Sequence, residues 1–212
     1  MSTIITLISD THANHDSVEI APSDILIVAG DYCCRNTEAE FHDFISWVIK
    51  QPVNEILMVS GNHDNFPYRH REQFLEIIEK NNIIYLENSS ATISGIRFWG
   101  SPVIVPIMEG FRKRNQLDEV ERKKIWDTIP MDTDILVTHS PPYGIHDLVR
   151  GEHCGCKALL EKVMEIKPRY HLFGHIHQAY GESEMNGIIF KNGTLAGDDT
   201  QRIMNKPFRF AF

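Results

Sequence analysis

The chain has 212 residues, of which 24% are charged and 42% are hydrophobic, and its formal net charge is −8. This length and composition are typical of one globular α/β domain with a complete core, so we expect residues 1–212 to form a single domain. The acidic balance argues against broad charge-driven binding to nucleic acid or to anionic membranes, although bound dications would still allow an anionic substrate.

The chain shows no sign of membrane insertion or secretion. No apolar run reaches the roughly 18–20 residues that span a bilayer. The N-terminus lacks a basic segment, and Asp10 interrupts the first apolar stretch, which argues against a secretory signal. The four cysteines stand as Cys33-Cys34 and as Cys154 with Cys156, without the spacing of a structural zinc site. We therefore expect a cytoplasmic protein with reduced thiols and no membrane partner.

Three apolar runs in the first third of the chain predict buried strands, at about 4–9, 25–29 and 56–60. Continuous Ile, Leu and Val over this length is typical of strands covered on both faces. The runs lead directly into Asp10-Thr11-His12, Asp31 and Asn62-His63-Asp64. A helix is predicted to begin near Thr37, where Thr37-Glu38-Ala39-Glu40 fits a capping box, and a second helix is predicted at about 69–80.

The middle of the chain changes character. Short runs at 83–86, 91–93 and 96–99, with Ser94-Gly95 as a turn, are typical of antiparallel strands, so the sheet is expected to be mixed or doubled. Residues 101–130 are the least regular part, with a helix expected at about 117–126. The basic cluster Arg112-Lys113-Arg114 is interpreted as a solvated charge run, with a phosphate-facing loop as the alternative.

The last third repeats the pattern of a strand followed by a polar group. A strand at 135–138 leads into His139, and a strand at 170–174 leads into His175-Ile176-His177. A helix is predicted between them at about 157–167, and further strands are expected at 188–191 and 207–212.

Five predicted strands therefore end in residues that bind metals. In open α/β sheets, sites form beyond the carboxyl ends of strands, so these residues predict one shared metal site. His175 and His177 stand two apart, as Asp10 and His12 do. If the chain is extended there, side chains at i and i+2 point the same way and each pair faces one cavity. Carboxylate, amide oxygen and neutral imidazole suit Mn²⁺, Fe, Zn²⁺ or Mg²⁺.

In order and spacing, these motifs resemble the five blocks of the calcineurin-like metallophosphoesterases. The matching residues are Asp10-Thr11-His12, Gly30-Asp31, Gly61-Asn62-His63-Asp64, Thr138-His139 and Gly174-His175-Ile176-His177. Three further stretches are similar to the MPPED-type, cyclic-nucleotide-phosphodiesterase-like branch, namely Thr138–Pro142, Gly155-Cys156 and Gly174–Gly181. The resemblance implies an α/β fold, a four-layer α/β/β/α sandwich of two mixed β-sheets flanked by helices.

The resemblance also implies a dinuclear centre of two divalent metal ions, with Mn²⁺ as the first choice. One ion would take Asp10, His12, Asp31 and His177. The other would take Asp31, Asn62, His139 and His175, so that Asp31 bridges the pair. A hydroxide bridging the ions would attack phosphorus without a phospho-enzyme. His63 would not bind metal and would donate a proton to the departing oxygen.

Two departures from the wider superfamily bear on the substrate. Phosphoprotein phosphatases carry an aspartate where this chain has Cys34, and they lack the paired Pro141-Pro142. Both features argue against a phosphoprotein. The loop at 101–111, usually rich in Trp and Phe in the MPPED-like branch, is aliphatic over much of its length here.

We therefore expect hydrolysis of a small cyclic or linear phosphodiester as the activity of this chain. A phosphomonoesterase is the alternative within the same class, and homodimer formation is left open. A metal-free interaction scaffold is the alternative from another class. It is disfavoured because all seven ligand positions and His63 are present.

Overall fold

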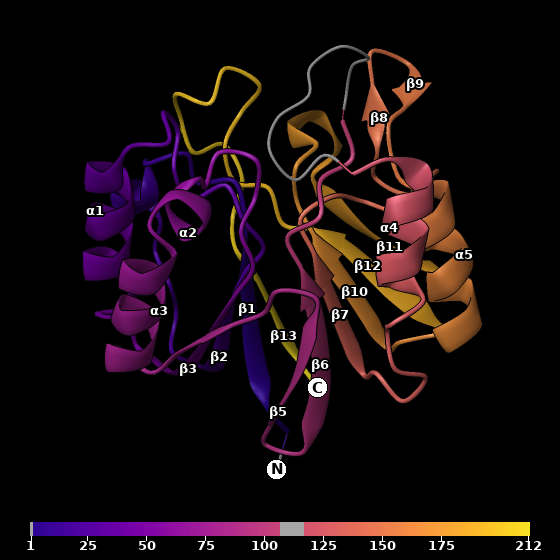
Figure 1. Cartoon of the computed structure of the whole chain (residues 1–212), viewed down its shortest axis with the longest axis horizontal. Helices are drawn as coiled ribbons and strands as arrows, with labels where there is room; N and C mark the ends of the chain where they lie inside the picture. Colours follow the sequence, from indigo (N-terminus) through magenta and orange to yellow (C-terminus); the bar gives the residue numbers. More distant parts are fainter. Residues whose placement is uncertain (1, 107–116) are drawn as a thin grey trace.

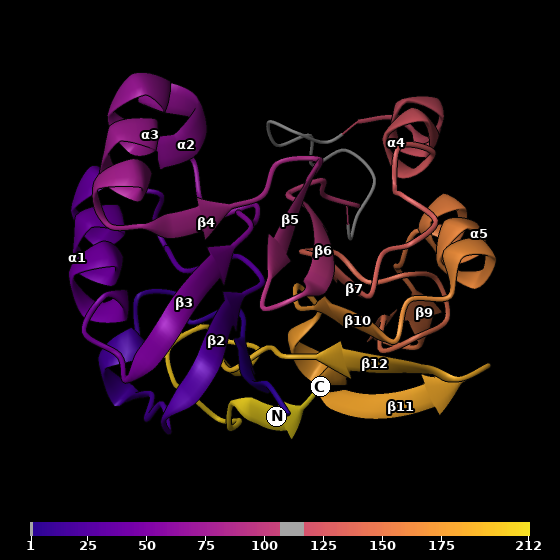
Figure 2. The same ribbon diagram turned by 90° about the horizontal axis from the view of Figure 1, so that it is seen from below.

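The computed structural model describes residues 2–106 and 117–212, so the basic cluster at 112–114 lies outside the described residues. Two β-sheets lie face to face, and helices cover the outer face of each sheet (Figures 1 and 2). This confirms the predicted four-layer α/β/β/α sandwich of two mixed sheets.

The first sheet contains five strands in the order β13-β1-β2-β3-β4. They are β1 (Ile4–Ile8), β2 (Ser23–Val28), β3 (Val53–Met58), β4 (Ile83–Tyr85) and β13 (Phe208–Ala211). The first four run parallel to one another, whereas β13 pairs antiparallel with β1. The outer face of this five-stranded sheet is covered by α1 (Glu38–Val48), α2 (Phe66–Arg69) and α3 (Arg71–Lys80) (Figure 2). The carboxyl ends of β1, β2 and β3 therefore meet at one edge.

The second sheet contains six strands in the order β11-β12-β10-β7-β6-β5. They are β5 (Ser89–Ile93), β6 (Ile96–Ser101), β7 (Ile135–Thr138), β10 (Tyr170–Phe173), β11 (Gly181–Met185) and β12 (Ile188–Asn192). The four central strands are parallel, and an antiparallel strand closes each edge. Helices α4 (Glu119–Trp126) and α5 (Lys157–Ile166) cover its outer face (Figure 2).

Three hydrophobic clusters hold the four layers together. One lies between α1–α3 and the five-stranded sheet and contains Phe41, Phe44 and Phe74. The second lies between the sheets, where the inward-facing residues of β1 and β2 meet those of β7 and β10. The third lies beneath α4 and α5 and contains Trp99 and Trp126. The continuous apolar runs in the sequence arise because these central strands are covered on both faces.

Several local predictions are confirmed, and others need correction. The capping box of α1 is present, with Glu40 N donating to Thr37 Oγ1 at 3.2 Å and Thr37 N donating to the Glu40 carboxylate at 3.2 Å. The helix predicted at about 69–80 is present as α3, whereas the short α2 before it was not predicted; His70, at φ −131° and ψ 51°, separates the two. The sequence did not predict β11, because its residues are mostly polar and exposed and show no apolar alternation.

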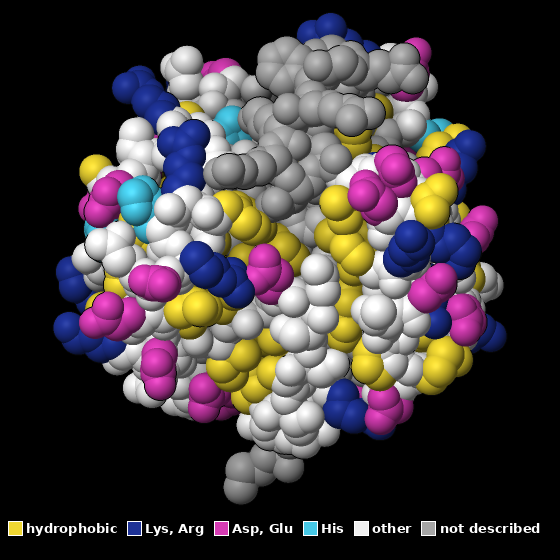
Figure 3. Space-filling view, in the orientation of Figure 1, with side chains coloured by type: hydrophobic (Ala, Val, Ile, Leu, Met, Phe, Trp, Pro, Cys, Tyr) yellow, Lys and Arg dark blue, Asp and Glu magenta, His cyan; other side chains and the backbone are white. Residues whose placement is uncertain are grey.

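A short hairpin, formed by β8 (Leu148–Val149) and β9 (Glu152–His153), was also not predicted. Two short 3-10 turns complete the described elements, η1 (His15–Ser17) and η2 (His177–Ala179). In the described part of the chain, every helix is too short or too polar to cross a bilayer. On the face shown in Figure 3, Lys and Arg alternate with Asp and Glu, without a broad basic area among the coloured residues.

Candidate metal centre

The residues predicted from five separate strand ends meet at one place, at the upper edge of the sandwich in Figure 1. Three groups of side chains have ligand atoms within 4.8 Å of one another. They are Asp10 with His12 and His177, His12 with Asp31 and His63, and Asp31 with His139 and His175. Asn62 joins the last group, because its Oδ1 lies 3.2 Å from His139 Nε2. All eight predicted side chains are therefore neighbours.

The backbone that presents these side chains is not extended, so the reason given for the i, i+2 pairs is wrong. Asp10, His12, Asp31 and His175 have φ values of 53°, 45°, 53° and 72°, in the left-handed region that is uncommon for residues other than glycine. His175 and His177 still line one cavity, as expected, but they belong to different ligand groups, because the chain turns between them and enters η2. Strained residues of this kind cluster at functional sites, where the surrounding structure holds them.

Five imidazoles of the site are each tethered through one ring nitrogen to a backbone carbonyl. His12, His63, His139 and His177 use Nδ1, and His175 uses Nε2, at 2.7–3.2 Å. The carbonyls belong to Cys33, Cys34, Ala29, Gly197 and Val105. A carbonyl only accepts, so each tethered nitrogen carries the proton. In the neutral ring, the other nitrogen is then a bare lone pair, as a metal ligand requires.

These lone pairs face other acceptors at short range. His12 Nε2 lies 3.1 Å from His177 Nε2, and His139 Nε2 lies 3.2 Å from Asn62 Oδ1. Two acceptors at this distance repel unless a proton or a cation lies between them. In addition, Asp10 Oδ1 is buried and has no hydrogen-bond partner among the described residues. Carboxylate, amide oxygen and imidazole in this arrangement fit divalent cations of the Mn²⁺, Fe²⁺ and Zn²⁺ type.

The carboxylate of Asp31 lies between the groups. Its Oδ1 accepts a hydrogen bond from the His63 backbone N–H at 2.7 Å, and its Oδ2 lies 3.4 Å from His139 Nε2 and 3.9 Å from His12 Nε2. Asp10 sits to one side. Its Oδ2 accepts from His175 N and Thr194 Oγ1, both at 2.9 Å, which leaves Oδ1 directed toward His177 Nε2 at 3.4 Å.

Burial and charge shift the pKa values of these groups in opposite directions. Burial would raise the pKa of Asp31, but the surrounding imidazoles, with His139 foremost, together hold it well below its usual range. For His139 itself, burial would lower the pKa, but Asp31 raises it to about 9. Burial and the charge of His139 lower the pKa of His175 to about 3. In the metal-free protein a proton on His139 therefore balances the carboxylates, and a divalent ion held by His139 would take the place of that proton.

Some residues that position the site were not singled out from the sequence. The buried Asp64 accepts from the backbone N–H groups of Asp31, Gly61 and Cys33, at 2.7, 2.7 and 3.0 Å. It therefore holds the loop of Asp31 against the loop of Asn62. The position of Asp64 at the end of the motif Gly61–Asp64 could have indicated this role. Thr194, which donates to Asp10, stands in no such motif. Cys33 and Cys34 also lie beside the site, where their carbonyls accept hydrogen bonds from the His12 and His63 rings.

Glycine is required where these loops meet. A side chain at Gly61 would overlap the Asp31 carboxylate and the His139 ring, and one at Gly174 would overlap Ser9 and Asp10. The motif glycines therefore allow the backbone to approach the ligands closely.

Comparison with known protein families agrees with the geometry of this metal centre. A family model described as calcineurin-like phosphoesterase matches residues 3–179. The chain belongs to the calcineurin-like phosphoesterase family.

Among curated relatives, this phosphoesterase is 32% identical over 224 residues to the human metallophosphoesterase domain-containing protein 1, covering 94% of this chain and 68% of the relative. It is 31% identical over 219 residues to a UPF0046 protein of Caenorhabditis elegans, covering 97% of this chain and 74% of the relative. The resemblance to the MPPED-type branch is therefore confirmed. The crystal structure of TT1561 from Thermus thermophilus superposes with a TM-score of 0.66 at 13% identity, covering 95% of this chain and 92% of that chain, which shows the shared fold.

A buried histidine supports the strand end that carries His139. His171 is fully buried, and its Nε2 lies 2.9 Å from Thr138 Oγ1, which donates to the carbonyl of Ser140 at 2.7 Å. Because the Thr138 hydroxyl has only one proton, His171 Nε2–H is the donor in this pair. Burial lowers the pKa of His171 to about 3.

We expect His171 to make the metal-free protein acid-sensitive. An unfolded histidine titrates near 6.5, so the unfolded state takes up a proton first as the pH falls. The stabilising effect of the neutral ring is complete above pH 6.5 and is lost as the pH falls toward 3. Between pH 7 and pH 5 this amounts to about 2 kcal/mol. Chemical unfolding at both pH values should therefore show a smaller pH-dependent loss for His171→Gln, whereas the exposed His42→Gln control keeps the wild-type difference. An unchanged difference in His171→Gln would contradict the assignment.

Proposed function

We propose that this protein is a divalent-metal-dependent phosphodiesterase that hydrolyses small cyclic or linear phosphodiesters. One observation carries the proposal: the rings of His12, His139 and His177, each held through Nδ1 by a backbone carbonyl, direct Nε2 toward the carboxylate of Asp10 or Asp31. An interaction scaffold has no need for buried imidazoles and carboxylates gathered and oriented in this way. The proposed centre would hold two divalent ions per chain, with Mn²⁺ as the first choice.

The cavity over the candidate ligands supports a small substrate. Its volume is about 240 Å³, below the roughly 300–1,000 Å³ of typical drug-sized ligand pockets. Beyond the site histidines, Asp31 and Asn62, it is lined by Val149, Ile176, Gln178, Asp198 and Thr200. Within the described ranges, no Lys or Arg lines it. A monoester dianion would gain from such a cation more than a diester monoanion would, so the lining supports the diester.

The roles of the protein groups follow from their geometry. Bound divalent ions would supply an activated water and neutralise charge on the phosphoryl oxygens. Asp31 would hold the ions in register, and its Oδ1 fixes the His63 backbone. The His63 ring packs edge-on against His12 at a centroid distance of 4.8 Å, and its Nδ1 donates to the Cys34 carbonyl at 2.7 Å. A proton on Nε2 is then the one that His63 would transfer to the departing oxygen. The Cys34 carbonyl orients the ring, as an aspartate does in the phosphoprotein phosphatases.

The remaining expectations belong to the same proposal. The four cysteines are free, which supports a reducing compartment such as the cytoplasm. The partner is a small phosphoester, and residues 1–212 would act as one domain.

The proposal is tested by stripping the protein with a chelator and reloading it with Mn²⁺, Fe²⁺, Zn²⁺ or Mg²⁺. We expect about two ions per chain by elemental analysis and metal-dependent hydrolysis of bis(para-nitrophenyl) phosphate and of cyclic nucleotides. Para-nitrophenyl phosphate, a monoester with the same leaving group, should react more slowly. Faster monoester hydrolysis would make the protein a phosphomonoesterase, and failure to bind metal would favour the scaffold.

A further inference from the structure

The chain between β7 and α5 leaves the second sheet and returns to it as a clasped loop. Its two ends are joined, because Cys156 N donates to the Pro141 carbonyl and Tyr143 N donates to the Cys156 carbonyl, both at 3.0 Å. The β8–β9 hairpin forms the far end of the loop, with Arg150 and Gly151 at its tip in left-handed geometry, at φ 52° and 88°. The loop begins directly after His139, so its base is anchored to the metal centre.

A single buried carboxylate closes this loop. Asp147 is 1% exposed. Its Oδ2 accepts from the backbone N–H groups of Gly144 and Gly155 at 2.8 and 2.9 Å, and its Oδ1 lies 2.6 Å from His153 Nδ1. Its carbonyl also accepts from Cys154 N at 3.0 Å. The carboxylate thus joins both ends of the loop, at Gly144 and Gly155, to strand β9, at His153.

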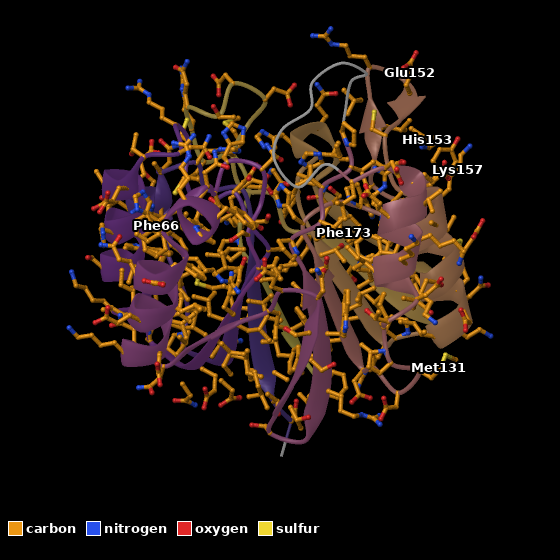
Figure 4. The ribbon with its side chains drawn as sticks, viewed as in Figure 1. Phe66, Met131, Glu152, His153, Lys157 and Phe173 are labelled. Atoms are coloured by element: carbon orange, nitrogen blue, oxygen red, sulfur yellow. The ribbon has the colours of Figure 1, made fainter. Side chains whose placement is uncertain are left out.

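The foot of the hairpin is braced from outside. The His153 ring lies 5.1 Å from the Tyr143 ring, and the Lys157 ammonium lies 5.0 Å over the same ring. Figure 4 shows Glu152 and His153 on β9, with Lys157 beside them at the start of α5. These contacts hold the hairpin in one orientation relative to the sheet.

The hairpin presents one side chain to the cavity of the metal centre. Val149 lines that cavity together with His63, His175 and His177, whereas the preceding Leu148 is 48% exposed. Strand β8 packs against η2, which begins at His177. Asn192 Nδ2 donates to the carbonyls of Ile176 and His146 at 2.9 and 3.4 Å, which ties the loop to the segment between the two site histidines.

We propose that Val149 is the apolar wall against which an organic group of the diester packs, and that Asp147 is a positioning residue that holds this wall over the metal centre. The inference rests on the function proposed above and adds a substrate class: diesters with at least one aromatic or nucleoside group. Ile176, also in the lining, extends the apolar surface. A flat apolar group gains from contact with such a surface, whereas a methyl group leaves most of it uncovered.

The test compares Val149→Ala with Leu148→Ala, a neighbouring change on the solvent side of the same strand. We expect Val149→Ala to raise KM for bis(para-nitrophenyl) phosphate about tenfold, with kcat within about twofold of wild type. Leu148→Ala should leave both constants unchanged. Equal KM values in the two variants, or a loss confined to kcat, would contradict the proposed contact between Val149 and the organic group of the substrate.

The positioning role is tested by non-additivity. Asp147→Ala should reproduce the KM effect with metal content unchanged, and combining it with Val149→Ala should add little, because both changes remove the same contact. His153→Gln, which removes only one of the Asp147 partners, gives a milder version if the larger change impairs folding. Fully additive effects would overturn the positioning role. A KM for Asp147→Asn as high as that for Asp147→Ala would also overturn it, because asparagine keeps an oxygen that can accept a hydrogen bond.

A wild-type protein without diesterase activity would overturn the proposed function and leave the wall testable by binding. The Kd of bis(para-nitrophenyl) phosphate for the manganese-loaded protein should then rise about tenfold in Val149→Ala and stay constant in Leu148→Ala. An unchanged Kd in Val149→Ala would overturn the wall independently of any activity.

Discussion

Asp31→Asn is expected to remove most of the bound metal and to lower the rate of diester hydrolysis by more than about 10³-fold, beyond the usual loss for one electrostatic donor. Within the described ranges, Asp31 is the only carboxylate shared by two ligand groups, so its charge acts on both sites. Asparagine keeps one oxygen but loses the charge that two divalent ions would share. Elemental analysis should show fewer than one ion per chain.

Two matched variants make this result specific. Asp10→Asn changes a carboxylate that belongs to one ligand group, so we expect it to lose about one ion and keep the other. Asp16→Asn changes an exposed carboxylate of the same loop and should keep both ions and full activity. Near-normal metal content in Asp31→Asn would show that Asp31 does not bridge two ions.

His63→Gln is expected to separate chemistry from metal binding. Loss of a positioned general acid typically costs about 10²–10⁴ in rate. An alkoxide leaving group needs that proton, whereas para-nitrophenolate departs without it. The variant should therefore lose hydrolysis of cyclic nucleotides far more than hydrolysis of bis(para-nitrophenyl) phosphate, with metal content near wild type.

The structure gives this experiment a clear alternative outcome. The His63 ring is also close enough to Asp31 and His12 to share an ion with them. Loss of metal in His63→Gln would therefore identify His63 as a ligand, and equal slowing of both substrates would assign it to charge stabilisation. The exposed His70→Gln, a histidine seven residues further along, controls for a non-specific effect of the change.

The sequence predicted the layered fold well because the decisive signals are local. Apolar runs such as Ile25–Ala29 and 135–138 are continuous because both faces of those strands are buried, and burial is recorded in every residue of the run. Each run ends at a polar residue of the site, because the parallel strands bring their carboxyl ends to one edge. The prediction failed at β11, which is mostly polar, and at the β8–β9 hairpin, whose two-residue strands are too short to carry a periodic signal.

The sequence by itself determined the set of eight side chains and the order of the strands that precede them. Both can be read from neighbouring positions, because residue type and apolar pattern are local properties. Only the tertiary structure decided how these side chains are held. The carbonyls that fix the tautomers of His12, His175 and His139 lie 21, 70 and 110 residues away along the chain. The left-handed backbone at Asp10, His12, Asp31 and His175 follows from packing between loops, because for any residue with a side chain this conformation is uncommon and four such residues in one site need support from the surrounding structure.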